Sequence, residues 1–395
     1  TLRYFQFSMS TLFIIQEASY LFDVDAFKDR CFEIKEIVGE NVDLCYSMKA
    51  NPFLIEFLPD CISRVEVCSP GEMCICEHYN IPSKMVFYSG VNKNTEDVAD
   101  AFRYGVKDFT VESYKHLSII NNLGKANDTV IPIYIRISSE TQFGMDINDV
   151  KKIIHDRSSY PYVIIAGIHF FSGTQKKKTD QIIKELSEIE EFIINTKETY
   201  DHEIKEVEYG TGLFIDYFNN YDQKYYDLKQ ISYSLNSLAS ITKLTIEMGR
   251  YFAAPCGYYI TRIDDIKNND GENFIIVDGG MNQLVYDGQL KAMRKPAITH
   301  IDCSGSIVSR NNQKEYTICG SLCTTSDVIV RDYALSEPQI GDYLIFHKTG
   351  AYTFMEGMST FLSREMPQIW ALKSGELIML RDRIYTHQFN RRRDG

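Results

Sequence analysis

The sequence predicts an α/β protein made of a (β/α)8 barrel followed by a β-rich domain. The chain has 395 residues, which is enough for two domains. Apolar segments with strand character alternate with helical segments through the first part of the chain. After Arg250 the pattern changes, and strands follow one another with turns between them and little helical signal.

The barrel is expected between residues 26 and 255. Residues 20–25 are predicted to form a strand that enters a helix at Ala26. Eight apolar segments then have the length and composition of buried strands: 44–48, 64–68, 85–89, 108–112, 131–138, 163–171, 206–210 and 243–248. The segments between them have helical length and pattern, for example 176–200 with its Ile-Ile-x-x-Leu-x-x-Ile spacing. Eight strands that alternate with helices are the number that closes such a barrel.

The second domain is expected over residues 256–395. Its predicted strands are 258–263, 273–278, 315–319, 327–331 and 342–346. Residues 1–25 form a separate N-terminal segment in this division. The boundaries are therefore 1–25, 26–255 and 256–395.

Composition and charge exclude several classes of protein. A net charge of -12 and a pI near 5.2 argue against a nucleic-acid or anionic-membrane partner, and the short basic run 391–393 is expected to be a solvated tail or a linker. No apolar stretch reaches the roughly 18 residues that a membrane span needs. The ten cysteines are scattered, and the close pair Cys74 and Cys76 lacks partners for a zinc site, so no metal is expected. We predict a cytoplasmic enzyme with reduced thiols.

The unusual polar residues fall at the carboxyl ends of the predicted strands, where barrel enzymes carry their chemistry. Lys49 follows the first strand, and a desolvated lysine amine can form a Schiff base with a carbonyl compound. A lone lysine is more often solvated, and a lone histidine in an apolar run more often belongs to the core. Their joint occurrence on one rim favours a site. The rim residues are Lys49, Glu66, Arg136, His169, Ser172, Gly210, Thr211, Gly212, Glu247, Gly249 and Arg250.

These groups fit pyridoxal 5'-phosphate. This cofactor needs a lysine for its aldehyde, an anion beside its ring nitrogen, and backbone N–H groups with a cation for its phosphate. Glycines allow the backbone to approach a phosphate closely. The sequence therefore predicts a pyridoxal phosphate site on the barrel rim.

Five ordered motifs carry a resemblance to a known family. They are Tyr46-Ser-Met-Lys-Ala-Asn, His169-Phe-Phe-Ser-Gly-Thr-Gln, Glu247-Met-Gly-Arg, Cys319-Gly-Ser-Leu-Cys-Thr-Thr-Ser-Asp and Gly350-Ala-Tyr. Over residues 18–365 the chain resembles the fold type III pyridoxal-phosphate decarboxylases, the group of diaminopimelate and ornithine decarboxylases. The resemblance implies an alanine racemase-like barrel, a C-terminal β-sandwich that the N-terminal strand joins, and a homodimer with shared active sites.

The resemblance also implies a role for each residue. Lys49 would carry the cofactor, His169 would stack on its ring, and Glu247 would pair with the ring nitrogen. Ser172, the loop 210–212, Arg250 and Tyr352 would hold the phosphate. Cys323, from the second subunit, would return a proton to the carbon that has lost carbon dioxide. The alternative is that Cys323 is a packing thiol and Tyr352 a core tyrosine, and that neither takes part in the reaction.

Two positions depart from the family pattern. Thr211 stands where the family has a glycine, so some glycine-only conformations are forbidden and phosphate binding is expected to weaken. Thr324 follows Cys323 where diamine-forming members have a carboxylate for the distal ammonium. We therefore expect a glutamate-like or tethered amino acid as substrate, as in the antibiotic and siderophore branch, and the alternative is a decarboxylase of diaminopimelate, lysine or ornithine.

Two other functions compete with decarboxylation. A racemase would use the same cofactor but needs two opposed bases, whereas Glu247 at the ring nitrogen favours decarboxylation. A cofactor-free homologue would act by binding a partner protein, and the altered loop at Thr211 is what keeps that alternative open.

Overall fold

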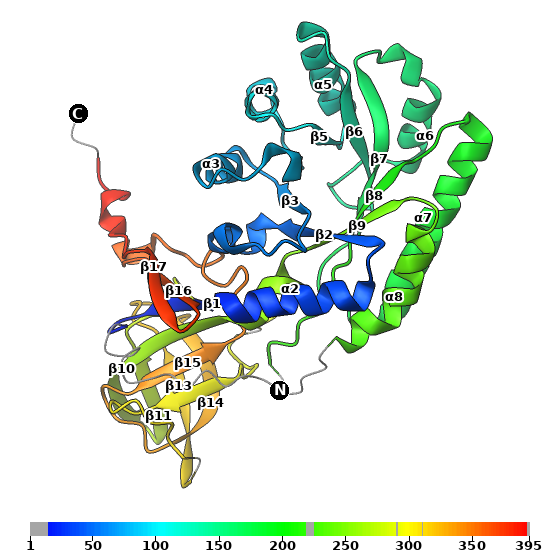
Figure 1. The fold of residues 1–395 in the computed structure, drawn as a ribbon. Helices are drawn as coiled ribbons and strands as arrows, with labels where there is room; N and C mark the ends of the chain where they lie inside the picture. Colours follow the sequence, from blue (N-terminus) through cyan, green and yellow to red (C-terminus); the bar gives the residue numbers. More distant parts are fainter. Residues whose placement is uncertain (1–14, 219–224, 290, 310, 393–395) are drawn as a thin grey trace. The chain divides into compact units, whose positions relative to one another are not determined.

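The computed structural model describes residues 15–218, 225–289, 291–309 and 311–392 (Figure 1). Of the predicted N-terminal segment, residues 1–14 lie outside the described residues, as does Arg393 of the basic run. The chain divides into two compact units. The barrel unit comprises Lys28–Ile215 and Gln223–Phe252, and the sheet unit comprises Thr1–Phe27, Asp216–Asp222 and Ala253–Gly395.

The barrel unit contains the predicted closed ring of eight parallel strands. The strands are β2 (Val42–Ser47), β3 (Arg64–Val67), β4 (Val86–Tyr88), β5 (Asp108–Val111), β6 (Ile131–Ile137), β7 (Val163–Phe171), β8 (Glu206–Gly210) and β9 (Lys243–Met248). All eight predicted strands are confirmed, and those of β7, β8 and β9 have the predicted bounds. Strand β2 pairs with β9, which closes the ring.

Helices connect the strands and surround the ring (Figure 1). They are α2 (Val24–Val38), α3 (Pro70–His78), α4 (Thr95–Tyr104), α5 (Tyr114–Ala126), α6 (Ile147–His155), α7 (Thr179–Tyr200), α8 (Tyr226–Ala239) and the short α9 (Arg250–Ala253). Side-chain caps fix where the rim loops turn into helices: Ser69 accepts from Glu72 N before α3, and Asn94 forms a capping box with Asp97 before α4. Among the described residues, no helix is long and apolar enough to cross a membrane.

Helix α7 begins three residues later than the prediction of 176. Lys176 is held in an extended conformation, because its N–H donates to Gly212 O at 2.8 Å and the residue bridges to Leu213. The sequence pattern could not reveal this pairing, because its partner lies more than thirty positions away.

The sheet unit contains nine strands in one mixed sheet. They are β1 (Ser19–Asp23), β10 (Gly257–Asn269), β11 (Glu272–Val277), β12 (Ile298–Ile301), β13 (Gln313–Cys319), β14 (Val328–Ser336), β15 (Tyr343–His347), β16 (Gln368–Lys373) and β17 (Glu376–Arg381). The main order is β14-β13-β11-β10-β1-β16-β17, with β15 pairing to both β10 and β12. The N-terminal strand therefore joins this sheet, antiparallel to β10 and parallel to β16.

Three strands of this sheet were not predicted. Strand β12 has only four residues, two of them polar, so its pattern is weak. Strands β16 and β17 form a hairpin around Ser374 and Gly375, and this small-residue turn between apolar runs was a usable signal. The core beneath these strands includes Leu21, Ile260, Ile345, Trp370 and Leu372.

Candidate active site

Lys49 lies directly beyond the carboxyl end of β2, in a 3-10 turn that spans Met48–Ala50. Its two neighbours are buried, whereas the lysine side chain is 37% exposed. The amine is 2.6 Å from Glu66 Oε2 on β3 and 3.7 Å from Glu247 Oε1 on β9. The turn thus fixes the backbone and leaves the amine accessible, with two carboxylates beside it.

Gly249 permits this arrangement. A Cβ atom at Gly249 would lie 2.7 Å from the Ala50 side chain and 3.0 Å from Ser47 O. The chain leaving β9 can therefore pass directly against the turn that carries Lys49, and Arg250 follows at once as the first residue of α9.

Glu247 is the most connected carboxylate of the site. Ser47 Oγ donates to its Oε1 at 2.8 Å, and His169 Nε2 is 3.1 Å from its Oε2. Burial raises the pKa of Glu247, but the Lys49 ammonium and the His169 hydrogen bond outweigh burial, so the pKa lies below its ordinary value. The structure therefore provides a buried anion at the centre of the barrel mouth.

His169 is 1% exposed, and its Nε2 edge is engaged with Glu247. Side chains alternate along a strand, so Phe171 faces the same side of β7, two residues nearer its carboxyl end. Phe171 is only half-buried. Phe171 was not among the predicted site residues, although the motif that begins at His169 contains it.

Glu66, His169 and Glu247 have ligand atoms within 4.8 Å of one another, a geometry that could hold a cation. The Lys49 ammonium already lies within 4 Å of both carboxylates. Its positive charge offsets theirs, so these residues belong to the lysine site. A thiol also lies here, since Cys68 Sγ is 3.6 Å from Lys49 Nζ. Burial and then Glu66 raise the pKa of Cys68, which keeps the thiol neutral.

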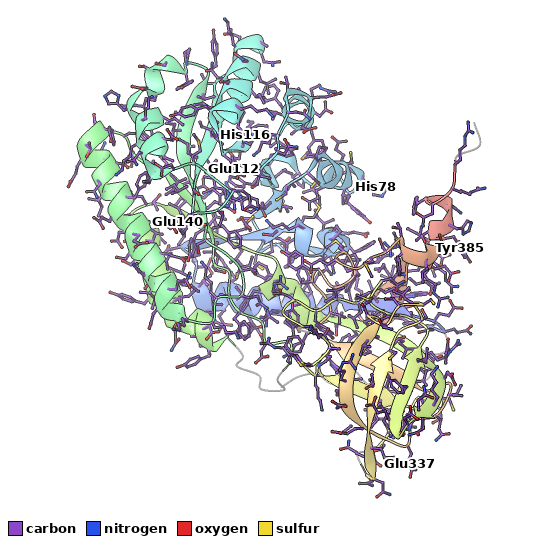
Figure 2. The ribbon with its side chains drawn as sticks, turned by 180° about the vertical axis from the view of Figure 1, so that it is seen from behind. His78, Glu112, His116, Glu140, Glu337 and Tyr385 are labelled. Atoms are coloured by element: carbon purple, nitrogen blue, oxygen red, sulfur yellow. The ribbon has the colours of Figure 1, made fainter. Side chains whose placement is uncertain are left out.

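Arg136 on β6 is oriented by a residue that the sequence analysis did not select. Its Nη1 is 3.3 Å from Glu112 Oε1, and Gly144 N donates to Glu112 Oε2 at 3.0 Å. Glu112 and His116 are both marked in Figure 2, and Glu112 N donates to His116 Nδ1 at 3.3 Å. Arg136 Nε is buried and has no hydrogen-bond partner among the described residues.

The loop 210–212 follows β8 and is tightly confined. A Cβ atom at Gly212, where φ is +61°, would lie 2.0 Å from Gly173 O, and one at Gly210 would lie 2.4 Å from the Phe171 ring. Thr211 between them is fully buried, and its hydroxyl has no partner among the described residues. Glycine is therefore required at the two outer positions, whereas the middle position accepts threonine. Ser172, from the preceding loop, donates its hydroxyl to Glu185 at 2.6 Å.

The remaining predicted site residues lie in the sheet unit. Cys323 is exposed in the loop between β13 and β14. Asp327 braces this loop by accepting from Leu322 N at 2.7 Å and from Met281 N at 2.8 Å, and Thr324 N donates to Leu322 O. Tyr352 has a φ of +65°, in the left-handed region, which it shares with other turn residues of this chain such as Asp270 and Ser374.

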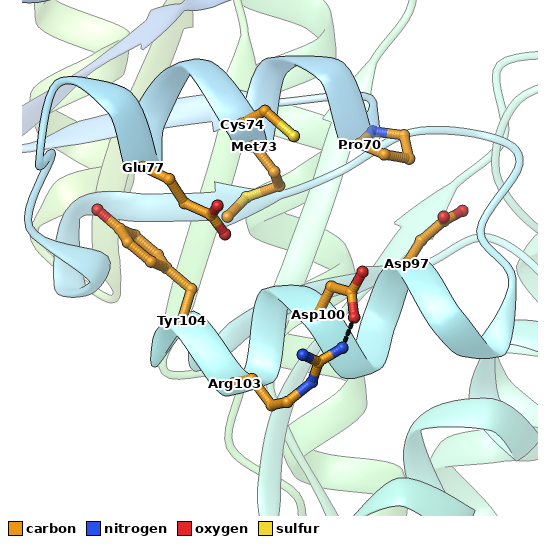
Figure 3. A pocket seen from close by; sticks show the side chains of 8 residues that line it. All are labelled: Pro70, Met73, Cys74, Glu77, Asp97, Asp100, Arg103 and Tyr104. Carbon is orange, nitrogen blue, oxygen red and sulfur yellow. Dashed lines mark ion pairs between the residues drawn. The ribbon is translucent and has the colours of Figure 1, made fainter.

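A separate pocket lies on the outer side of the barrel unit between α3 and α4 (Figure 3). Its volume is about 370 Å³, and it is lined by Pro70, Met73, Cys74, Glu77, Asp97, Asp100, Arg103 and Tyr104. Arg103 is paired with Asp100. None of the predicted site residues lines this pocket, so we assign the chemistry to the rim around Lys49.

The rim groups fit pyridoxal phosphate. They supply an accessible amine, a buried anion and a glycine-framed loop. Three buried polar atoms in this region, Thr211 Oγ1, His169 Nδ1 and Arg136 Nε, have no partner among the described residues. Together with the closed barrel, this donor set defines an enzyme of the barrel-type pyridoxal phosphate class.

Comparison with known proteins supports this class. The family model described as "Pyridoxal-dependent decarboxylase, C-terminal sheet domain" matches residues 20–350. The diaminopimelate decarboxylase of Methanocaldococcus jannaschii is 24% identical over 94% of this chain and 88% of its own. The L-glutamyl-(BtrI acyl-carrier protein) decarboxylase of Niallia circulans is 25% identical over 92% of this chain and 90% of its own.

A solved structure has the same fold. The diaminopimelate decarboxylase of Helicobacter pylori, crystallised with L-lysine, superposes with a TM-score of 0.84 at 22% identity and covers 96% of this chain and 98% of that one. The chain belongs to the pyridoxal-dependent decarboxylases. It is a carboxy-lyase with pyridoxal phosphate as cofactor, as the sequence predicted.

Proposed function

We propose that this decarboxylase acts on a glutamate-like amino acid, free or tethered to a carrier, as in antibiotic or siderophore biosynthesis. The observation that carries the proposal is Thr324 beside Cys323. A distal ammonium buried against a threonine would lack a counter-charge, which is costly. The relative from Niallia circulans, whose name specifies a carrier-linked glutamyl group, supports the proposal.

The barrel residues have separate tasks. The bound cofactor supplies an electron sink for the bond to the departing carboxylate. Lys49 holds the cofactor through its amine, next to Glu66. Glu247 keeps the ring nitrogen protonated, because it is an anion held by Ser47 and His169. The loop 210–212 and Arg250 receive the phosphate.

Cys323 completes the reaction by delivering a proton to the carbon that has lost its carboxylate. We propose that this thiol comes from a second copy of the chain in a homodimer. Its exposure is consistent with that role. Several large apolar side chains of the sheet unit are also exposed and offer a surface for a second copy: Met355, Met358, Phe361, Leu362 and Phe389. The ten free cysteines agree with the proposed cytoplasmic location.

Borohydride reduction followed by peptide mass spectrometry tests the role of Lys49. Reduction should fix one pyridoxyl phosphate on the peptide that contains Lys49, and Lys49→Arg should abolish the label. Lys93 provides a matched control, since burial lowers the pKa of this second lysine to about 8. Lys93→Met should retain the label on Lys49. An unlabelled protein, even with excess cofactor, would favour the alternative of a cofactor-free binding protein.

Carbon dioxide release from a panel of substrates tests the specificity. Glutamate and carrier-linked glutamate should exceed diaminopimelate, lysine and ornithine in kcat/KM by at least about tenfold. Thr324→Glu should shift the preference toward the diamine precursors, because it supplies the missing carboxylate. Preferred cleavage of diaminopimelate by the unaltered chain would support the alternative, to which most of the similar curated proteins point.

A further inference from the structure

Glu185 is a buried carboxylate that the proposed chemistry does not use. It lies in the second turn of α7 and is 6% exposed. Each of its oxygens has two donors. Oε1 accepts from Ser172 Oγ at 2.6 Å and from Gln181 Nε2 at 3.1 Å, and Oε2 accepts from Lys176 Nζ and Tyr209 OH, both at 2.6 Å. Four donors on one buried side chain are typical of a group that holds other elements in place.

Three of the four donors come from the chain segments that frame the loop 210–212, and the fourth, Gln181, lies on α7 itself. Ser172 and Lys176 belong to the connection between β7 and α7, and Tyr209 is the penultimate residue of β8, directly before the loop. Lys176 N also donates to Gly212 O at 2.8 Å. The loop therefore has a second fixed point besides the end of its own strand.

A further contact extends this connection. Gln175 accepts from Ile215 N at 2.8 Å and donates to Ile215 O at 3.2 Å. Gly212 is also packed closely against Gly173 O, so the two loops contact each other at more than one point. Their relative position depends on the carboxylate that ties both to α7.

The opposite charges of Glu185 and Lys176 compensate each other. Burial raises the pKa of Glu185, but the hydrogen bonds from Lys176, Ser172 and Tyr209 outweigh it, so the pKa is lowered and the group is ionised. Burial lowers the pKa of Lys176, whose ammonium has Glu185 as its counter-ion. Removal of either charge would leave the other buried and unpaired, which costs more than the pair contributes.

Ser172 has only one hydroxyl hydrogen, and it points to Glu185. We propose that Glu185, with Lys176 as counter-ion, positions Ser172 and the loop that binds the cofactor phosphate. This inference rests on the proposed function only in assigning the loop 210–212 to the phosphate.

The test compares two forms of the cofactor. Glu185→Gln and Lys176→Met should each weaken binding of pyridoxal phosphate by at least about tenfold, measured by absorbance titration. Binding of pyridoxal, which lacks the phosphate, should change by less than about twofold, because the rim around Lys49 is untouched. The exposed pair Lys184 and Glu188, 3.4 Å apart on the same helix, provides the control, and Glu188→Gln should alter neither affinity.

A double-mutant cycle tests the role of Ser172. If Glu185 positions the serine, Ser172→Ala should cost less affinity in the Glu185→Gln variant than in the unaltered chain. Equal weakening of both cofactor forms, unchanged affinity for pyridoxal phosphate, or additive effects of the two substitutions would each overturn the inference. If Glu185→Gln does not fold, the paired variant Glu185→Gln with Lys176→Met restores charge balance for the same titration. Failed labelling of Lys49 would instead refute the proposed function.

Discussion

Two buried glutamates of the same barrel differ in protonation: the pKa of one is raised and the pKa of the other is lowered. Glu208 on β8 and Glu247 on β9 are both at most 6% exposed. Burial raises the pKa of Glu208 to about 8, whereas the pKa of Glu247 lies below its ordinary value. In the register of the two strands, Glu208 pairs with Thr245 and Glu247 pairs with Gly210, so Glu247 lies two residues nearer the carboxyl end of the strands.

The number of cations available to each acid explains this difference. Near Glu208 the Arg64 guanidinium serves three carboxylates: Glu208 at 2.6 Å, Glu206 at 2.7 Å and Asp108 at 3.3 Å. Burial raises the pKa of Glu208 more than the shared Arg64 lowers it, so this fully buried acid retains its proton, whereas Glu206 also has Lys243 at 3.2 Å. Glu247, by contrast, has the Lys49 ammonium, His169 and Ser47 as partners.

The Arg64 layer contributes to stability, whereas the Glu247 layer contributes to the chemistry. Arg64 is permanently charged and only 7% exposed, so its layer of side chains fills the barrel interior. The layer around Glu247 contains a lysine whose side chain is 37% exposed and ion-paired to Glu66 and Glu247. Substitutions in the two layers should therefore affect different measurements.

The largest expected effect is on stability, from Arg64→Met. The variant removes the buried cation shared by three carboxylates and leaves only Lys243, 3.2 Å from Glu206, so we expect the free energy of unfolding in urea to fall by about 3–5 kcal/mol. Arg103→Met, which removes an exposed ion pair on α4, should cost at most about 1 kcal/mol. A similar loss in both variants would mean that the Arg64 layer does not stabilise the barrel.

The next effect is on catalysis, from Glu247→Gln. The amide can still accept from Ser47 but carries no charge to hold a proton on the cofactor ring. We expect kcat to fall by about 10²-fold, the scale for losing one preorganised electrostatic contact. Circular dichroism should confirm that the variant is folded. An unchanged kcat would separate Glu247 from the chemistry.

The smallest effect is a change in pH dependence, from Glu208→Gln. The pKa of Glu208 is raised in the folded protein from its ordinary 4.5 to about 8, so the folded state binds the extra proton between these values. Its contribution to stability is therefore complete below about 4.5 and is lost as the pH rises through 8. Urea unfolding between about pH 5 and pH 9 should show a smaller decline for Glu208→Gln than for the unaltered chain. Parallel curves would mean that Glu208 is already ionised at neutral pH.

Much of this architecture could be predicted because it is periodic. The eight barrel strands are continuous apolar runs, and their alternation with helices identified the fold. Lys49, Glu66, His169 and Glu247 could be selected because polar residues at strand ends share one rim in any parallel barrel. Their pairwise contacts then followed from the closed ring.

The residues that were missed act through contacts distant in sequence. Glu185 is one acid among several on a long amphipathic helix, and only folding brings it to Ser172 and Tyr209. Likewise, Glu112 becomes a site residue only because it pairs with Arg136, 24 positions later in the chain. Strand β12 forms because β15 offers it a free edge.

The sequence by itself determined the order of the strands, the reactive lysine, the cofactor class and the family. Each of these depends on local pattern or residue type, which the chain carries before it folds. The tertiary structure decided which buried acids are charged and which side chain receives the Ser172 hydroxyl. Charge state depends on how many cations lie within a few ångströms in a medium of low polarity, and those distances exist only in the folded chain.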